Sequence, residues 1–307
     1  MHIRTNPVLN VLFRPVLNLS QWLGTNYPVF FAKLRYFARF KKRLNLNNPQ
    51  TLNEKMLYLS LCTDTKTWTE LADKYRVREY VQACGLDEIL VRLYGVWDSP
   101  YDVDYDKLPS QFVLKSNHGS GDVVIVKDKS TLNIEATNKY FAKELATPYG
   151  TLESGLHYMK IQPKLVAEEL LKNDAVSLKY SSSLIDYKIW CFNSKAYYVW
   201  VCCNRDKHGC DVMTYDIEWN AHPEYSIWMS HYRKGQVIPK PKNFEKMIEI
   251  AERLAKPYPV VSVDLYNLDG KIYFGEMTFT RLGGLINFYT PEFLSMCGDI
   301  INLDYKG

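Results

Sequence analysis

The alternation of apolar and polar positions predicts a chain built largely from paired antiparallel strands. Runs rich in Val, Ile, Tyr and Trp at 111–116 and 123–127, and again at 186–192 and 196–203, have the length and composition of strands, and a short polar turn joins each pair. A third pair of apolar runs lies within 260–284 and flanks Asp269-Gly270, a strong hairpin signal. Further extended segments are expected at 89–96 and 164–171.

Helical periodicity marks the remaining ordered segments. Over 244–256 the apolar residues fall on one face, Asn243 can cap the helix, and Pro257 ends it. Other helices are expected at 54–61, 67–84, 130–146 and 291–301, and a loop is expected from 205 to 232. Since these elements do not alternate as repeated strand–helix units, the pattern favours an α+β fold.

Composition narrows the class of protein. The 307 residues are 47% hydrophobic and 23% charged, which is typical of a soluble globular chain forming one large domain or two to three subdomains. Seven cysteines without a CxxC pair indicate a reducing cytoplasm rather than a disulfide framework or a zinc site. Arg14 interrupts the first apolar run, so no cleavable signal is expected, and the Pro and Asn residues of 15–32 make that segment a poor membrane span.

Positive charge is concentrated at the N-terminus. The net charge is +4, but residues 1–50 contain eight Lys and Arg and no Asp or Glu, while the rest of the chain carries 30 basic and 34 acidic residues. Within residues 1–43, Phe30, Leu34, Phe37 and Ala38 recur at helical spacing. This segment could lie on an anionic membrane surface or pack on the body of the protein. No motif supports binding of nucleic acid.

Carboxylates on the predicted hairpin within 260–284 are candidate metal ligands. Glu276 and Thr278 share a strand face, and oxygen ligands suit Mg²⁺. A two-residue turn would pair 264 with 275 and point Glu276 away from Asp264, whereas a three-residue loop would pair 264 with 274 and bring both acids to one face. A magnesium site therefore requires an odd loop or a bulge, and an ordinary surface hairpin is the alternative.

A glycine-rich turn at 117–122 (NHGSGD) joins two predicted strands. It cannot be a Walker A loop, which must open a helix. Its backbone N–H groups could instead cover phosphate oxygens, with Lys115 on the preceding strand adding positive charge. A plain hairpin turn is the alternative. The adjacent acids Glu168 and Glu169 follow an apolar run, which suggests that this end of the strand lies at an edge where it contacts a polar group. Asp186 shares a strand face with Lys188.

Taken in order, these features resemble the ATP-grasp fold. From about Asn45 the chain is similar to the TupA-like ATP-grasp family, found in cell-surface polysaccharide gene clusters. The resemblance rests on TLNEKMLYL, ADKYRVREYV, LPSQFVLKSNHGSG, DYKIWCFNSK, and VVSVDLYNLDGKIYFGEMTF followed by Gly-Gly. It implies two α+β subdomains with antiparallel sheets clamping ATP, at 66–170 and 171–307, preceded by a basic, aromatic helical segment at 1–65.

The resemblance also implies roles for individual residues. Expected at the nucleotide are Lys115, Gly119, Ser120, Gly121, Glu168, Glu169, Leu170, Leu171, Asp186 and Lys188. Expected at Mg²⁺ are Asp264, Glu276 and Thr278, the last where most ATP-grasp enzymes have Asn. Expected in catalysis are Lys188, Arg205 and Arg281, and expected at the substrate are Lys74, Arg78, Gly283 and Gly284. Arg281-Leu282 stand where a Pro- and Gly-rich stretch is usual, which suggests an unusual substrate.

The activity implied is that of an ATP-dependent carboxylate-amine ligase working through an acyl phosphate. The substrates expected from the family's setting are a uronic acid or other carboxylated sugar of a capsule or exopolysaccharide and an amino acid or amine, in the cytoplasm or at the inner face of the membrane. The alternatives are a glycosyltransferase using the DxD motif Asp102-Val103-Asp104, a sugar kinase, and a non-catalytic membrane scaffold.

Overall fold

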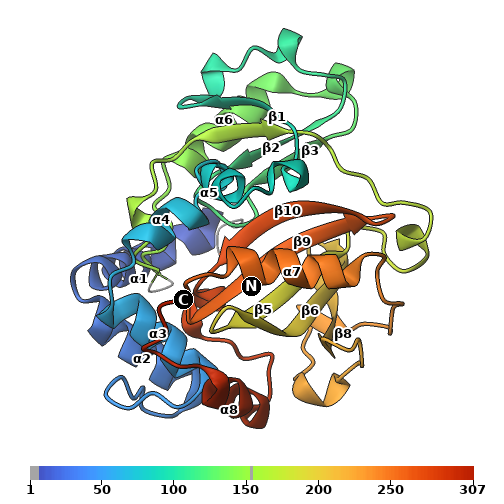
Figure 1. Ribbon diagram of the computed structural model, residues 1–307. Helices are drawn as coiled ribbons and strands as arrows, with labels where there is room; N and C mark the ends of the chain where they lie inside the picture. The colour runs from blue at the N-terminus through green and yellow to red at the C-terminus, as the bar shows by residue number, and fades with distance from the viewer. Residues whose placement is uncertain (1–6, 153–154) are drawn as a thin grey trace.

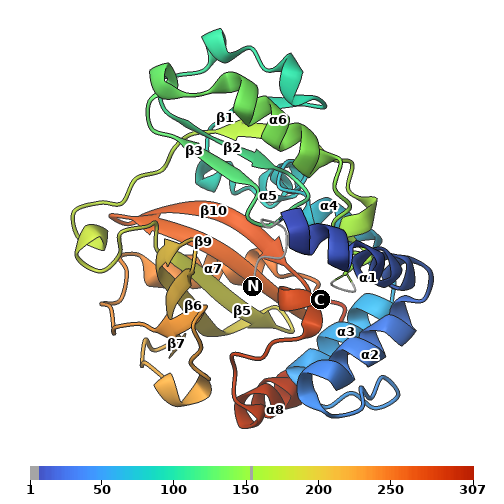
Figure 2. The same cartoon turned by 180° about the vertical axis from the view of Figure 1, so that it is seen from behind.

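The computed structural model describes residues 7–152 and 155–307 and contains two sheets, one above the other in Figure 1. The first has the order β1-β4-β2-β3 with every pair antiparallel. Its strands are β1 (Leu93–Trp97), β2 (Phe112–Ser116), β3 (Val123–Val126) and β4 (Leu165–Glu168). Helix α6 (Ile134–Leu145) covers this sheet (Figure 2), where Phe141 packs with Phe112 and Leu165 in a small separate core.

The second sheet is larger and carries the main core. Its order is β10-β9-β5-β6-β7-β8, and only the short β8 runs parallel to its neighbour. Its strands are β5 (Asp186–Phe192), β6 (Lys195–Asp206), β7 (Gly209–Asp216), β8 (Tyr232–Lys234), β9 (Val260–Leu268) and β10 (Lys271–Thr278). All seven residues of β5 are buried, as expected for a central strand covered on both faces.

Helix α7 (Phe244–Leu254) packs on this sheet through the apolar face that periodicity predicted, including Phe244, Met247 and Leu254. The expected cap is wrong, however. Asn243 has a left-handed backbone, makes no capping bond, and donates its side-chain amide to the carbonyl of Gly270 at 2.8 Å. The residue therefore ties the start of α7 to the β9–β10 turn rather than to its own helix.

Two of the elements expected from the sequence are wrong, and in each case the side chain of one aspartate explains the difference. The helix expected at 67–84 is split into α4 (Lys66–Ala72) and α5 (Val77–Ala83), because the side chain of Asp73 accepts the backbone N–H groups of Tyr75 and Arg76. The loop expected from 205 to 232 contains β7 and β8. There Asp206 accepts the N–H groups of His208 and Gly209 and closes a tight turn between β6 and β7.

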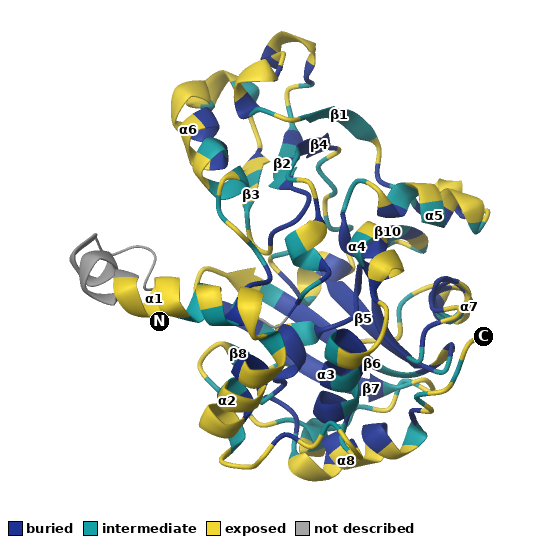
Figure 3. Ribbon diagram, turned by 90° about the vertical axis from the view of Figure 1, so that its left-hand side faces the viewer, coloured by how far each residue is buried: buried dark blue, intermediate teal, exposed yellow. Residues whose placement is uncertain are grey.

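The N-terminal part is helical, with α1 (Pro7–Asn26), α2 (Pro28–Phe40) and α3 (Leu52–Cys62); the last begins with a capping box of Thr51 and Glu54 and packs against the C-terminal α8 (Pro291–Ile300). Figure 3 shows many exposed residues along α1 and α2. Across the part of the chain that the structure describes, each helix is too short or too polar to cross a bilayer.

The two sheets come closest around β10, the edge strand of the larger sheet. Strand β10 contacts α4, and the segment between α4 and α5 is hydrogen bonded to the glycine-rich turn through Lys74 N–H and the carbonyl of Asn117. Figures 1 and 2 both place α4, α5 and the first sheet on the same side of β10. The candidate residues lie along this junction.

Candidate functional site

A bulge in the β9–β10 hairpin sets the position of its two acids. The turn has two residues, so Leu268 pairs with Lys271, but Gly275 is skipped and Asp264 pairs directly with Glu276. Directly opposed residues point to the same face of a sheet, so the bulge brings both carboxylates to one side. A Cβ atom on Gly275 would lie 2.9 Å from the carbonyl oxygen of Asp264, which explains why glycine occupies the bulge. Neither of the two pairings considered from sequence, 264 with 275 or 264 with 274, occurs. The hairpin instead combines the two-residue turn with the bulge that a magnesium site would require.

Asp264 is the centre of a buried ionic cluster. Its carboxylate accepts hydrogen bonds from Ser262 Oγ at 2.7 Å, from Arg281 Nη2 at 3.0 Å to each oxygen, and from Lys188 Nζ. Burial alone would raise the pKa of this carboxyl, but the charges of Arg281 and Lys188 outweigh it and lower the pKa to about 2. Asp264 is therefore anionic throughout the physiological range.

Lys188 links Asp264 to a second buried acid, Asp186, whose Oδ2 lies 2.6 Å from Lys188 Nζ. Burial lowers the pKa of the Lys188 ammonium, yet the two carboxylates together hold it above its ordinary value. Burial also raises the pKa of Asp186, against the opposing charges of Lys188 and Arg205. The Oδ1 atom of Asp186 is buried without a hydrogen-bond partner, so this end of the cluster has an unused acceptor.

Arg281 reaches the cluster from the segment after β10. Leu282 and Gly283 have left-handed backbone angles, and this turn folds Arg281 back over the sheet. Its guanidinium lies over the rings of Trp190 and Trp200, 5.7 and 5.6 Å from the ring centroids. Its Nε atom is buried and lacks a hydrogen-bond partner, so a donor remains available for an anionic ligand.

The glycine-rich turn is held by hydrogen bonds within the turn and by Lys74 from the segment between α4 and α5. Ser116 Oγ is 3.1 Å from Asp122 Oδ2 and accepts the N–H of Gly119, while Lys74 Nζ donates to the carbonyl of Gly119 at 2.5 Å. The N–H of Gly119 is therefore already used in this conformation. Ser120 and Gly121, at the tip, are exposed.

Lys115 and Arg78 converge on Glu168. Lys115 Nζ lies 2.5 Å from one carboxylate oxygen of Glu168, and Arg78 Nη1 lies 3.5 Å from the other. Glu168 is buried at the end of β4, whereas Glu169 is exposed and donates its N–H to the carbonyl of Arg92. The strand expected at 164–171 thus ends at Glu168, and Leu170 and Leu171 continue outside the sheet.

Lys74 connects the two groups of residues. It is partly exposed, but burial still lowers the pKa of its ammonium. The charge of Lys115 lowers this pKa further, whereas the charge of Glu276 is the strongest influence in the opposite direction. The Lys74 side chain therefore interacts electrostatically with Glu276 and Lys115 and is hydrogen bonded to Gly119 of the glycine-rich turn. The break in the helix at Asp73 places Lys74 at this junction, whereas Arg78, on α5, pairs with Glu168.

Three other expected residues and the DxD motif lie further from this centre. Arg205, half exposed, reaches it only through Asp186 at 3.4 Å. Gly283 and Gly284 are buried below Arg281, and a Cβ atom on Gly284 would lie 2.7 Å from Leu57 Cγ, so that glycine packs against α3. The DxD motif lies in the first subdomain, where Asp104 pairs with the exposed Lys107 at 2.8 Å.

Sequence reasoning missed Ser262 and Tyr158. Ser262 lies two residues before Asp264 on the same strand face, a spacing that could have revealed it. Tyr158, on whose hydroxyl the charges of Glu276, Arg281 and Asp264 act, begins a short 3₁₀ turn at Tyr158–Lys160, and no periodic pattern marks it.

The donor set fits a magnesium ion that arrives with a nucleotide. Within residues 7–152 and 155–307, no three Cys, His, Asp or Glu side chains form a ready-made metal cage. Glu276 and Thr278 offer oxygens at one place, with Thr278 Oγ1 3.3 Å from Glu276 Oε1, and Asp264 lies opposite. Mg²⁺ usually takes one or two carboxylates and fills its other positions with water and phosphate oxygens.

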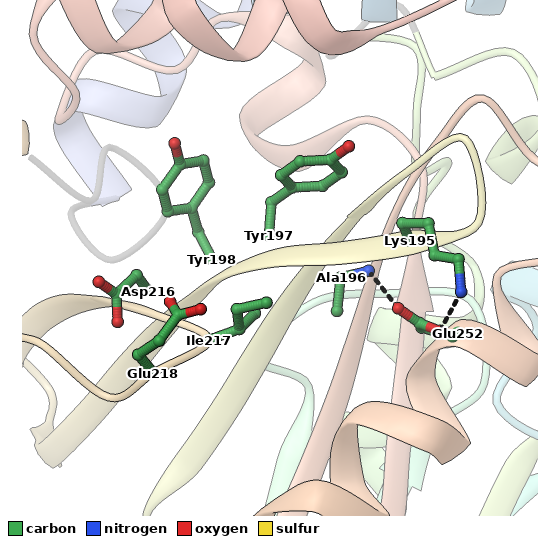
Figure 4. Close-up of a pocket in the computed structure, with 8 residues that line it drawn as sticks. All are labelled: Lys195, Ala196, Tyr197, Tyr198, Asp216, Ile217, Glu218 and Glu252. Carbon is green, nitrogen blue, oxygen red and sulfur yellow. Dashed lines mark hydrogen bonds and ion pairs between the residues drawn. The ribbon is translucent and has the colours of Figure 1, made fainter.

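A hollow of about 450 Å³ lies elsewhere, between the start of β6, the end of β7 and α7 (Figure 4). Tyr197 and Tyr198 stand above it, and Glu252 pairs with Lys195 and accepts the N–H of Ala196 at its edge. It contains none of the residues expected from the sequence.

Comparisons with known proteins place the chain in a family. The family model described as TupA-like ATPgrasp matches residues 51–302, whereas none of the curated proteins matches. Among solved structures, D-alanine–D-alanine ligase from Bacillus anthracis is 15% identical with a TM-score of 0.38, covering 68% of this chain and 57% of the ligase. N5-carboxyaminoimidazole ribonucleotide synthetase from Thermus thermophilus is 12% identical with a TM-score of 0.41, covering 70% and 47%.

The ATP-grasp ligase PsnB, complexed with a phosphomimetic variant of its minimal precursor, Mg and ADP, is 12% identical with a TM-score of 0.42, covering 76% of this chain and 58% of PsnB. This chain thus spans about half to three fifths of the length of these structures. Likenesses this low carry no argument about the site. The family model covers most of the chain, and together with the two largely antiparallel sheets it shows that this α+β protein belongs to the TupA-like ATP-grasp family.

Proposed function

We propose that this protein is an ATP-dependent carboxylate-amine ligase that activates its carboxylate as an acyl phosphate. The observation that carries the proposal is the buried cluster of Lys188, Asp264 and Arg281, which lies beside Glu276 and faces the glycine-rich turn through Lys74. Fixed charges buried away from water suit the transfer of a phosphoryl group, because catalysis of that reaction is mainly positioning and charge stabilisation.

Each group has a defined task in this proposal. Lys115 and Lys74 would neutralise phosphate charge under the glycine-rich turn, and the Nε of Arg281 would donate to the transferred phosphoryl group or the substrate carboxylate. Asp264 holds Lys188 and Arg281 in place. Glu276, with Thr278 and Asp264, would hold Mg²⁺, whose charge would stabilise the phosphate oxygens when it is bound.

The reaction balances without a protein nucleophile. A carboxylate oxygen of the substrate attacks the γ-phosphorus, the bond to the β–γ bridging oxygen breaks, and ADP leaves. The amine nitrogen then attacks the acyl carbon, phosphate leaves with the carboxylate oxygen, and the nitrogen loses a proton. Burial raises the pKa of the Cys191 thiol and that of the Cys297 thiol, which makes these two residues poor nucleophiles.

The substrates that we propose are a uronic acid or similar carboxylated sugar of a surface polysaccharide and an amino acid or amine. The test is to measure ADP from Mg-ATP with panels of sugar acids, neutral sugars and amines. We expect ADP only when a carboxylate is present, and trapping by hydroxylamine as a hydroxamate. ADP formed equally with a neutral sugar would instead identify a kinase, and turnover of nucleotide sugars a glycosyltransferase.

We also propose that α2 contacts an anionic membrane surface. The stripe noticed in the sequence faces outward, with Phe30 58%, Leu34 48% and Phe37 52% exposed, while the opposite face packs through Ala32 and Tyr36. Both expectations for this helix therefore have support, since one face packs and the other is exposed. Exposed basic residues surround the apolar face: Lys33, Arg39, Lys41, Lys42 and Arg43. Arg4, which was counted with them, lies outside the described residues.

The membrane contact can be tested by sedimentation with vesicles. The protein is expected to sediment with vesicles containing phosphatidylglycerol but not with neutral phosphatidylcholine vesicles, and salt should weaken the binding because it screens the charges. Replacing both Phe30 and Phe37 with Ser should abolish sedimentation. The control Val237→Ser removes an equally exposed apolar residue outside α2, and equal loss in that variant would refute the assignment.

A further inference from the structure

A second hollow, of about 640 Å³, adjoins the candidate site on the side of α1. It lies between the end of α1, His118 of the glycine-rich turn, and the irregular segment that follows α6. The volume is within the usual range for small-molecule sites. A Cβ atom on Gly24 would lie 1.8 Å from the carbonyl oxygen of Thr151, so glycine lets α1 pack directly against the segment that forms the other wall.

The lining has the chemistry that a sugar acid requires. Aromatic rings of Trp22, Tyr149 and Tyr158 provide apolar faces, and the amides of Asn26 and Gln162 provide donors and acceptors for hydroxyl groups. Lys160 adds a cation. None of the residues that line the hollow is Asp or Glu, so it offers no counter-charge to an ammonium group. The lining therefore suits the carboxylated partner of the reaction better than the amine.

His118 provides a polar atom that lacks a partner. It is 3% exposed, lines the hollow and has no hydrogen-bond partner at Nδ1. Leaving such a buried group without a hydrogen bond is energetically costly. A hydroxyl group of a bound ligand would satisfy it, because a hydroxyl can donate a hydrogen bond to a neutral ring nitrogen. The ring also stands edge-on to Tyr149, at a centroid distance of 6.5 Å, which fixes its orientation.

Tyr158 joins the hollow to the ionic cluster. Its ring packs against Tyr149 on the side of the hollow, at 5.2 Å between centroids. Burial raises the pKa of its hydroxyl, and the charges of Glu276, Arg281 and Asp264 also act on it. His118 is also adjacent in sequence to Gly119 of the turn. A ligand in the hollow could thus extend its carboxylate toward the phosphates.

We propose that this hollow binds the carboxylated sugar, with Trp22 against the face of the ring and Lys160 and His118 near its anionic and hydroxyl groups. This inference rests on the proposed ligase function, to which it adds the position of the acceptor. The hollow is lined by the end of α1, and α1 packs against α2, the helix proposed to contact the membrane. An acceptor attached to a membrane carrier could therefore enter the hollow from the membrane side.

The test measures binding of methyl glucuronoside and of its neutral analogue methyl glucoside by calorimetry, in the presence of Mg-ADP. We expect the glucuronoside to bind more tightly. Trp22→Ala should weaken it about ten-fold, the loss of a contact of about 1.4 kcal/mol, and Lys160→Met should remove the preference over the glucoside. Tyr101→Ala, an exposed aromatic residue in the first subdomain, is the matched control and should change neither.

Binding of Mg-ADP, measured separately in every variant, distinguishes the two proposals. If Mg-ADP binds normally but glucuronoside binding is absent, or is unchanged by both substitutions, the acceptor site is refuted and the ligase proposal survives. If the glucoside binds as tightly as the glucuronoside to the unmodified protein, the preference for an acid is refuted. If Mg-ADP does not bind at all, the ligase proposal fails, and the acceptor site fails with it.

Discussion

Replacing Glu276 with Gln is expected to reduce ADP formation by roughly 100- to 1,000-fold, a loss typical of removing one charge-stabilising group from a phosphoryl- or acyl-transfer site. Gln keeps the size and the hydrogen bond to Thr278, but it loses the charge that would hold Mg²⁺. Glu276 takes part in none of the ion pairs found among the described residues, so the fold should not change. The measurement is the rate of ADP release over a range of Mg²⁺ concentrations.

The control for this variant lies on the same hairpin. Asp269→Asn removes an exposed carboxylate at the turn, where it pairs with the exposed Lys242, and activity should stay within about two-fold of the unmodified rate, as for other exposed pairs. If Glu276→Gln retained similar activity, the hairpin would not be the metal site. If added Mg²⁺ restored the lost rate, the substitution would have weakened metal binding alone.

Replacing Lys188 with Met is expected to lower the free energy of unfolding by about 3 kcal/mol or more, because two buried carboxylates, Asp186 and Asp264, lose the ammonium between them. Urea unfolding at neutral pH measures the change. Lys195→Met is the matched control, since its pair with Glu252 is exposed and should contribute less than about 1 kcal/mol. Equal effects of the two substitutions would show that the cluster is not a major source of stability.

The pH dependence of this difference gives an independent check. Asp264 has a pKa of about 2 in the folded protein, below its ordinary value, so its stabilising contribution is complete above about pH 4 and is lost as the pH falls toward 2. Without Lys188, the pKa of Asp264 and that of Asp186 both rise, and protonation relieves part of the cost. The stability difference between the two proteins should therefore become smaller as the pH falls through this range.

Local sequence patterns predicted most of the hairpins and helices because each depends on residues close together in the chain. The Asp269-Gly270 turn, the apolar face of α7 and the glycine-rich turn between β2 and β3 are of this kind. Errors arose where one side chain competes with the regular pattern. Asp73 interrupts a helix, and Asp206 closes a turn within an apparent loop.

The candidate site was only partly accessible to such reasoning. The spacing of Glu276 and Thr278 indicated a shared face, and the order of charged residues along the chain indicated the family. The position of Asp264 relative to Glu276 depended on a bulge at Gly275, and a single skipped residue reverses the face of every later side chain. The partnership of Lys188 with Asp264 also required knowing that β5 lies beside β9, whereas the shared strand face of Asp186 and Lys188 followed from their spacing.

By itself, the sequence of this protein determined most of its strands, its α+β class, its family and the residue types suited to phosphate and Mg²⁺. Only the tertiary structure decided that Arg281 folds back onto Asp264, that Lys74 donates to the carbonyl of Gly119 in the glycine-rich turn, and that α1 closes a hollow beside His118. Hydrophobic periodicity and turn residues act over a few neighbouring positions. Charge pairs and cavities instead depend on contacts between segments far apart in the chain, such as Lys188 with Asp264, or Trp22 with Gln162 across the hollow.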